Sequence, residues 1–140
     1  MNRIPYKNLF TIAANCVAKL GFAELFLIPL RMALSPLLVR VLPAREFGFQ
    51  GRTYRQFYHG YNITWSNERA VEVPLARGWL EGVCPDRILE IGNVLSHYQP
   101  VKHRVLDKFE KRPGVINADI TEFEPGQDFD LILSVSTFEH

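Results

Sequence analysis

The chain has 140 residues, which is enough for one modest hydrophobic core. Its hydrophobic content of 47% and charged content of 22% are ordinary for a globular protein. Its net charge of +1 at pH 7 creates no field over the whole protein that attracts nucleic acid or membranes. We therefore expect no nucleic-acid partner. Cys16 and Cys84 are far apart in sequence and the histidines are dispersed, which favours free thiols in a reducing, cytoplasmic compartment and predicts no metal site.

Residues 1–45 form a strongly apolar leader that we expect to be helical. Charged residues interrupt it, so no apolar run reaches the roughly 18 residues that span a membrane. Pro29 and Pro36 are expected to kink or divide the helix. Three arrangements stay open for this leader, in this order of preference: helices packed on the domain, an interfacial helix in peripheral contact with a membrane, and a spanning segment.

Residues 46–85 are expected to form an aromatic-rich hairpin and a helix that pack on a sheet. Gly51 supplies a turn between two short strands within 47–54. The surrounding aromatic side chains form either a packing layer, which we favour, or a lid over a ligand site. A helix is predicted over 66–81, with Ser66 as its cap and with a bend or a new start at Pro74.

The segment 87–96 predicts a buried strand that ends in a turn. Ile88, Leu89 and Ile91 are apolar and β-prone, and Glu90 lies two places before Gly92. A glycine at the turn allows its amide to approach a ligand closely. A dinucleotide site would require two further glycines that the sequence lacks. The acid beside the turn therefore favours a ligand with an ammonium group.

Three further strands are predicted within 103–107, 114–119 and 128–136, each with a polar or acidic residue at or just past its carboxyl end. The intervening segments 93–102 and 108–114 are too short for normal crossover helices, so we expect loops or single turns there. In open α/β sheets, ligands bind outside the carboxyl ends of the strands. The pattern therefore predicts an α/β protein with a ligand site at this edge.

These segments together resemble the class I S-adenosylmethionine-dependent methyltransferases, especially the small-molecule type with a Glu-His pair after its fourth strand. The resemblance covers 86–140 and rests on Leu89–Gly92, Val105–Asp107, Asn117–Asp119 and Phe129–His140. It implies a partial Rossmann-like sheet of about four mainly parallel strands. It also implies S-adenosylmethionine as cofactor and a small-molecule methyl acceptor.

The resemblance assigns a part of the cofactor to each matching residue. Glu90 and Gly92 would face its methionine end, and Asp107 would accept hydrogen bonds from two ribose hydroxyls. Asp119 would receive the adenine amino group, with Ile120 packed on the ring. Each acid could equally be a turn former or a helix cap.

The last matching residues concern the reaction. Ser134 would end the fourth strand beside the cofactor, and Glu139 and His140 would flank the reacting methyl group as catalytic residues. A solvated histidine is an equal alternative for His140. A complete family member has seven strands, so we expect 86–140 to be the N-terminal half of a methyltransferase domain, in a fragment that is inactive alone and self-associates through the exposed edge of its fourth strand.

Two other classes of function stay open. A non-catalytic nucleoside or nucleotide binder on the same kind of sheet is favoured by the missing glycines. A membrane-associated scaffold is favoured by the apolar leader.

Overall fold

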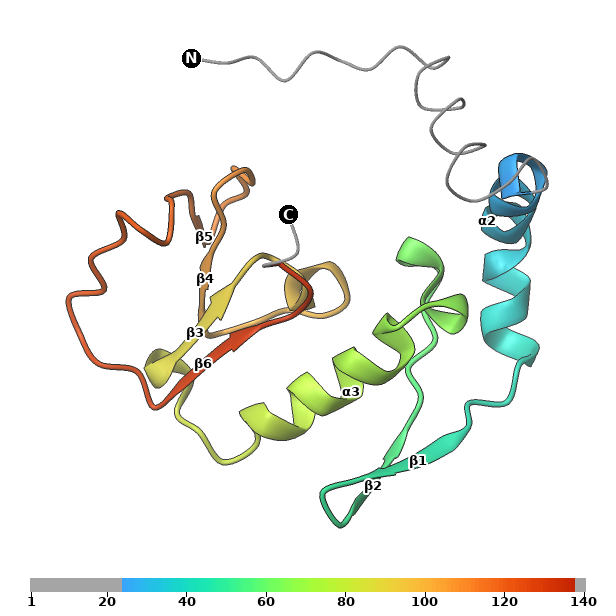
Figure 1. Cartoon of the computed structure of the whole chain (residues 1–140), viewed down its shortest axis with the longest axis horizontal. Helices are drawn as coiled ribbons and strands as arrows, with labels where there is room; N and C mark the ends of the chain where they lie inside the picture. The colour runs from blue at the N-terminus through green and yellow to red at the C-terminus, as the bar shows by residue number, and fades with distance from the viewer. Residues whose placement is uncertain (1–23, 138–140) are drawn as a thin grey trace. The chain divides into compact units, whose positions relative to one another are not determined.

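The computed structural model describes residues 24–137, and the side chains of residues 26–137. The chain divides into two compact units with a boundary after Leu42. The described part of the first unit is one helix, α2 (Glu24–Val41), which is continuous through Pro29 and Pro36 (Figure 1). Of the two expectations for these prolines, a kink or a division of the helix, the division was therefore wrong. No helix within 24–137 has the length and apolar character needed to cross a membrane.

The second unit is built on a parallel sheet of four short strands. These are β3 (Ile88–Ile91), β4 (Arg104–Leu106), β5 (Val115–Ile116) and β6 (Leu131–Ser134), in the order β5-β4-β3-β6. Every neighbouring pair is parallel. The predicted α/β class, strand number and strand direction are confirmed. Between β3 and β4 only a single 3₁₀ turn forms, η3 (Leu95–His97), as the short connection predicted.

A helix, α3 (Arg69–Leu80), packs against one face of this sheet and forms the core with it (Figure 1). The buried residues of this core are Val73, Ala76, Ile88, Leu95, Leu133 and Val135. The helix passes through Pro74 without a new start, so of the two expectations, a bend or a new start, the second was wrong. Proline has no N–H for the Ala70 carbonyl, and the backbone N–H of Phe57 donates to that carbonyl instead, at 2.8 Å. A segment outside the helix thus satisfies the group that Pro74 leaves open.

The helix begins three residues later than predicted. Ser66 ends a 3₁₀ segment, η1 (Tyr61–Ser66), and its hydroxyl donates to the Ile63 carbonyl, so it does not cap α3. In the first turn of α3, Arg69 and Glu72 form an ion pair at 3.0 Å. The Glu72 carboxylate also accepts a hydrogen bond from Ser136 beyond β6, which ties the helix to the end of the sheet.

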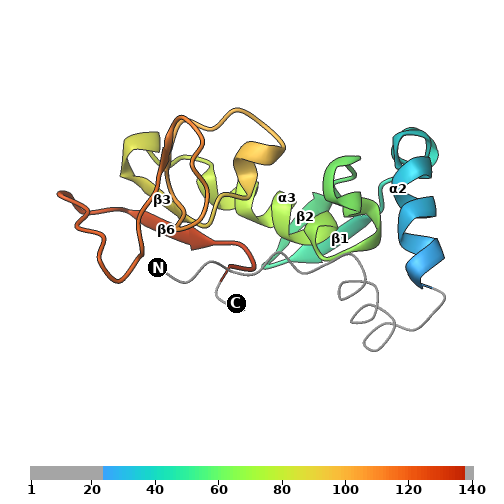
Figure 2. The ribbon, with the colours of Figure 1, turned by 90° about the horizontal axis from the view of Figure 1, so that it is seen from above.

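The predicted hairpin is present as β1 (Glu46–Phe49) and β2 (Arg52–Arg55), and it lies beside α3 (Figure 2). Gln50 and Gly51 at its turn have φ values of 49° and 74°, and two positive φ values are what a tight hairpin turn of the I′ type requires. A Cβ on Gly78 would lie 2.8 Å from the Tyr54 ring, so the hairpin packs closely on α3 at this glycine.

Candidate functional site

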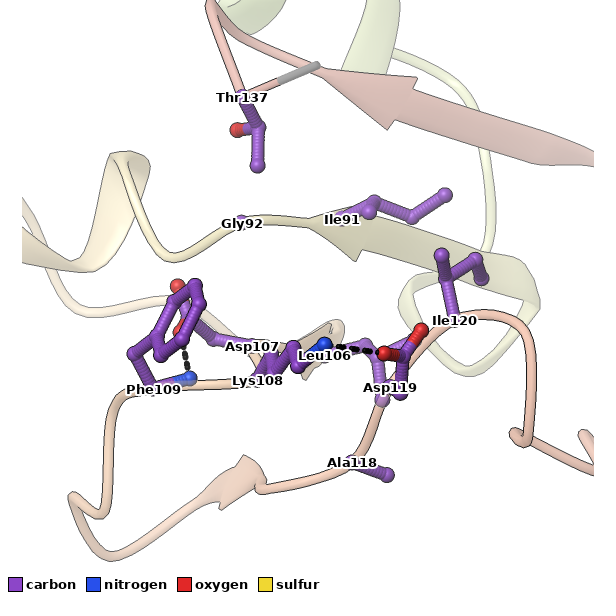
Figure 3. Close-up of a pocket in the computed structure, with 10 residues that line it drawn as sticks. All are labelled: Ile91, Gly92, Leu106, Asp107, Lys108, Phe109, Ala118, Asp119, Ile120 and Thr137. Carbon is purple, nitrogen blue, oxygen red and sulfur yellow. Dashed lines mark hydrogen bonds and ion pairs between the residues drawn. The ribbon is translucent and has the colours of Figure 1, made fainter. Parts of the chain in front are cut away.

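A pocket of about 270 Å³ lies at the carboxyl edge of the parallel sheet. Residues that follow each of the four strands contribute to it, because parallel strands end at the same edge. Its lining consists of Ile91, Gly92, Leu106, Asp107, Lys108, Phe109, Ala118, Asp119, Ile120 and Thr137 (Figure 3). Four of the six residues predicted to bind a cofactor are thus brought together: Gly92, Asp107, Asp119 and Ile120.

Gly92 forms the turn that ends β3, and both its backbone conformation and its surroundings require glycine. Its φ of +84° is one that side chains rarely adopt. A Cβ would also lie 2.0 Å from Oγ1 of Thr137, which stands over the turn (Figure 3). The Gly92 N–H donates to the Leu106 carbonyl at 2.8 Å. The amide that was expected to approach a ligand is thus used to join β3 to β4.

Asp107 follows β4 and organises the loops around the pocket. Its Oδ1 accepts the backbone N–H groups of Phe109 and Glu110, and its Oδ2 accepts that of Asn93. Burial would raise the pKa of Asp107, but these three donors outweigh it and hold the pKa below its usual value. A carboxylate offers about four acceptor positions, so among the described residues one position on Oδ2 remains open.

Lys108 and Asp119 both line the pocket and form a direct ion pair (Figure 3), with Nζ and Oδ2 2.5 Å apart. The backbone N–H and the hydroxyl of Thr121 both donate to Oδ1 of Asp119. The Lys108 ammonium and these donors lower the pKa of Asp119 to about 2. Phe109 and Ile120 are both exposed beside this ion pair and offer apolar surface to a flat ligand.

Glu90 has a different environment from the one expected, because it is not part of the pocket lining. Its side chain is fully buried, and its Oε1 accepts the backbone N–H groups of Val94 and Leu95. Nε2 of His103 lies 2.7 Å from its Oε2. Glu90 thus fixes the turn after Gly92 from inside the protein.

Ser134, the remaining predicted cofactor residue, lines a second cavity of about 170 Å³ between α3 and the end of β6. Its hydroxyl oxygen is buried and has no hydrogen-bond partner among the described residues. Nearby, Ser136 has a φ of +46°, which turns the chain after β6. The predicted catalytic residues, Glu139 and His140, lie outside the described residues.

Six of the ten lining residues were not predicted as site residues: Ile91, Leu106, Lys108, Phe109, Ala118 and Thr137. Lys108 and Phe109 directly follow Asp107, so their position after a strand was a signal for their inclusion. The aromatic side chains of 46–66, by contrast, are absent from the lining of the pocket within the described chain. They pack on α3 and on one another, for example Phe49 edge-to-face with Trp79 of α3 at 6.4 Å and Phe47 stacked on Tyr54 at 5.6 Å, which supports the packing layer and not the lid.

Within residues 24–137, no group of three or more histidine, cysteine or acidic side chains is arranged to hold a metal ion. No protein-family model, no curated protein and no solved structure matches this chain.

Proposed function

We propose that the pocket binds the adenosyl part of S-adenosylmethionine, and that the protein acts in methyl transfer to a small-molecule acceptor. One observation carries the proposal: Gly92, Asp107, Asp119 and Ile120, which belong to separate stretches of sequence, line one pocket at the carboxyl edge of a parallel sheet. The strand order β5-β4-β3-β6 supports it, because it equals the order 3-2-1-4 of the first four strands in the family that the sequence resembles.

The pocket fits a nucleoside. Its volume of about 270 Å³ is near the lower limit of ligand pockets, about 300 Å³, and suits one nucleoside better than a dinucleotide. Asp107 and Asp119 each keep one acceptor position on Oδ2, which suits a ribose hydroxyl and an adenine amino group respectively. Phe109 and Ile120 provide apolar surface for the ring.

The methionine end has less support. Thr137 fills the space over Gly92, and the Glu90 carboxylate is bound to backbone and to His103. In this proposal Glu90 therefore shapes the turn, while Asp107 and Asp119 hold the nucleoside. When bound, the cofactor supplies the activated methyl group, and these residues orient it so that the acceptor meets that methyl in line.

The test is calorimetry with S-adenosylhomocysteine on wild type, Asp107→Ala and Asp130→Ala. Asp130 is the matched control, because it lies at the opposite end of the same sheet, before β6, where it pairs with Arg87 at 2.8 Å. We expect Asp107→Ala to lose about 1.5–3 kcal/mol of binding free energy, the contribution of a hydrogen bond to a charged group, and Asp130→Ala to lose none. Circular dichroism checks that all three are folded. Equal affinities, or no binding by wild type, would refute the proposal.

A non-catalytic nucleotide binder is the second candidate, favoured by the Lys108 ammonium at the pocket. Adenosine monophosphate separates the two, since its phosphate is attracted to this cation and the uncharged thioether of S-adenosylhomocysteine is not. Binding of the monophosphate more tightly than S-adenosylhomocysteine would favour the nucleotide binder.

A further inference from the structure

Glu90 and His103 form a buried pair of titratable side chains beside the pocket. The Glu90 side chain is fully buried in β3, and the His103 side chain, directly before β4, is 5% exposed. Nε2 of His103 lies 2.7 Å from Oε2 of Glu90, so one proton lies between the two atoms, whichever of them carries it. A buried carboxyl group is costly unless its oxygens are hydrogen-bonded. Among the side chains that the structure describes, His103 is the one that bonds to Glu90.

The other oxygen of Glu90 holds the turn that follows β3. This Oε1 accepts the backbone N–H groups of Val94 and Leu95 at 2.9 Å and 2.8 Å. Directly before them in the chain, the backbone N–H of Asn93 donates to Oδ2 of Asp107 at 3.0 Å. The turn is thus attached to Glu90 inside the protein and to Asp107 at the pocket.

His103 itself lies outside the ligand pocket. It lines a separate cavity of about 170 Å³, and no residue that lines this cavity also lines the pocket. The cavity is smaller than ligand sites, which begin at about 300 Å³. The position of His103 therefore favours a supporting role over direct contact with a ligand.

We propose that His103 is a positioning residue of the pocket. It holds the carboxyl group of Glu90, which holds the turn, and the turn presents the Asn93 N–H that fixes Asp107. A ligand-binding side chain needs such support, because its geometry has to be kept within about 0.5 Å. For ligand affinity, this inference rests on the proposed function, in which Asp107 accepts from a ribose hydroxyl.

His103→Gln and His103→Asn form a matched pair of variants. Both replace the ring by an amide, which can donate and accept hydrogen bonds. The glutamine amide reaches about as far as Nε2, whereas the asparagine side chain is one methylene shorter and does not reach Glu90. We expect His103→Gln to behave as wild type and His103→Asn to release the turn. His103→Leu, which has no polar group, removes the same contact and replaces His103→Asn if circular dichroism shows that variant to be unfolded.

Amide hydrogen exchange followed by NMR measures the turn without a ligand. We expect the Asn93 amide to exchange about tenfold faster in His103→Asn than in wild type, because the turn opens locally. The Asp130 amide, which donates to the Arg87 carbonyl at 2.8 Å at the opposite end of the sheet, is the control and should be unchanged. Equal acceleration of both amides would show a general loss of stability and would overturn the proposal. So would an unchanged Asn93 amide, or the same acceleration in His103→Gln.

Calorimetry with S-adenosylhomocysteine measures the consequence for binding. We expect His103→Asn to bind about tenfold more weakly than wild type, the equivalent of one typical hydrogen bond. In the Asp107→Ala background the same change should have no further effect, because His103 acts through Asp107. An equal loss in both backgrounds would overturn this route. A wild type that does not bind S-adenosylhomocysteine would refute the proposed function alone, and exchange at Asn93 would then decide whether His103 positions the turn.

Discussion

Replacing Gly92 by alanine tests the structural basis of the pocket most directly, because two separate costs meet at this position. The first is conformational: at a φ of +84° an alanine pays about 1–2 kcal/mol for its Cβ. The second is steric, since that Cβ would lie 2.0 Å, 2.6 Å and 2.8 Å from Oγ1, Cγ2 and Cβ of Thr137. All three atoms belong to a short, branched side chain, so the backbone must move, at a cost typical of overpacking, about 1–3 kcal/mol.

Gly114 provides the matched control. Its φ of +87° is nearly the same, but a Cβ built there meets nothing within 4 Å. We therefore expect Gly114→Ala to lower the free energy of unfolding by about 1–2 kcal/mol and Gly92→Ala by about 2–5 kcal/mol. Urea unfolding followed by tryptophan fluorescence measures both.

Thr137→Gly in the Gly92→Ala background removes the clash. A double-mutant cycle should recover the steric part and leave the conformational part. Equal destabilisation by Gly92→Ala and Gly114→Ala, or no coupling to Thr137, would refute this reasoning.

Two further predictions follow from the ion pair and from the edge strand. In the folded protein the pKa of Asp119 is lowered from 3.8 to about 2. As the pH falls, the Asp119 carboxylate is therefore protonated in the unfolded chain before it is protonated in the folded chain. The stability that the ionised carboxylate contributes is present above pH 4 and is lost towards pH 2. Urea unfolding between pH 5 and pH 2 should show a flatter profile for Asp119→Asn than for wild type, and identical slopes would contradict the assignment. Among the described strands β6 pairs only with β3, and its Ile132 is 58% exposed, so Ile132→Lys should reduce self-association in sedimentation velocity. Ile120→Lys, the same change outside any strand, should have no effect, and equal behaviour of the two variants would remove β6 from the contact.

Local patterns in the sequence were sufficient to locate most elements of the second unit. The run of apolar, β-prone residues before Gly92 is β3, and Gly51 marks the turn of the β1–β2 hairpin. The positions of Asp107 and Asp119 after their strands were also sufficient to bring them to one pocket. Strand periodicity and turn chemistry depend on neighbours in sequence, and a parallel sheet places all carboxyl ends at one edge.

The hydrogen-bond partners of the polar groups depended on the tertiary structure. Glu90 was expected at the ligand, but the sheet turns it toward His103, which is 13 residues away in sequence. The Ala70 carbonyl beside Pro74 is satisfied by Phe57, which belongs to the segment after the hairpin. Periodicity does not identify such partners, because buried polar groups bond to whatever donor the packing brings within reach.

The sequence by itself therefore determined the α/β class, the strands and the edge at which their polar residues gather. The tertiary structure decided how each acid is used: Glu90 and Asp107 hold loops through backbone amides, and Asp119 pairs with Lys108. It also decided that Thr137 covers Gly92. These outcomes depend on contacts between segments distant in sequence, whose relative positions are determined only when the chain folds.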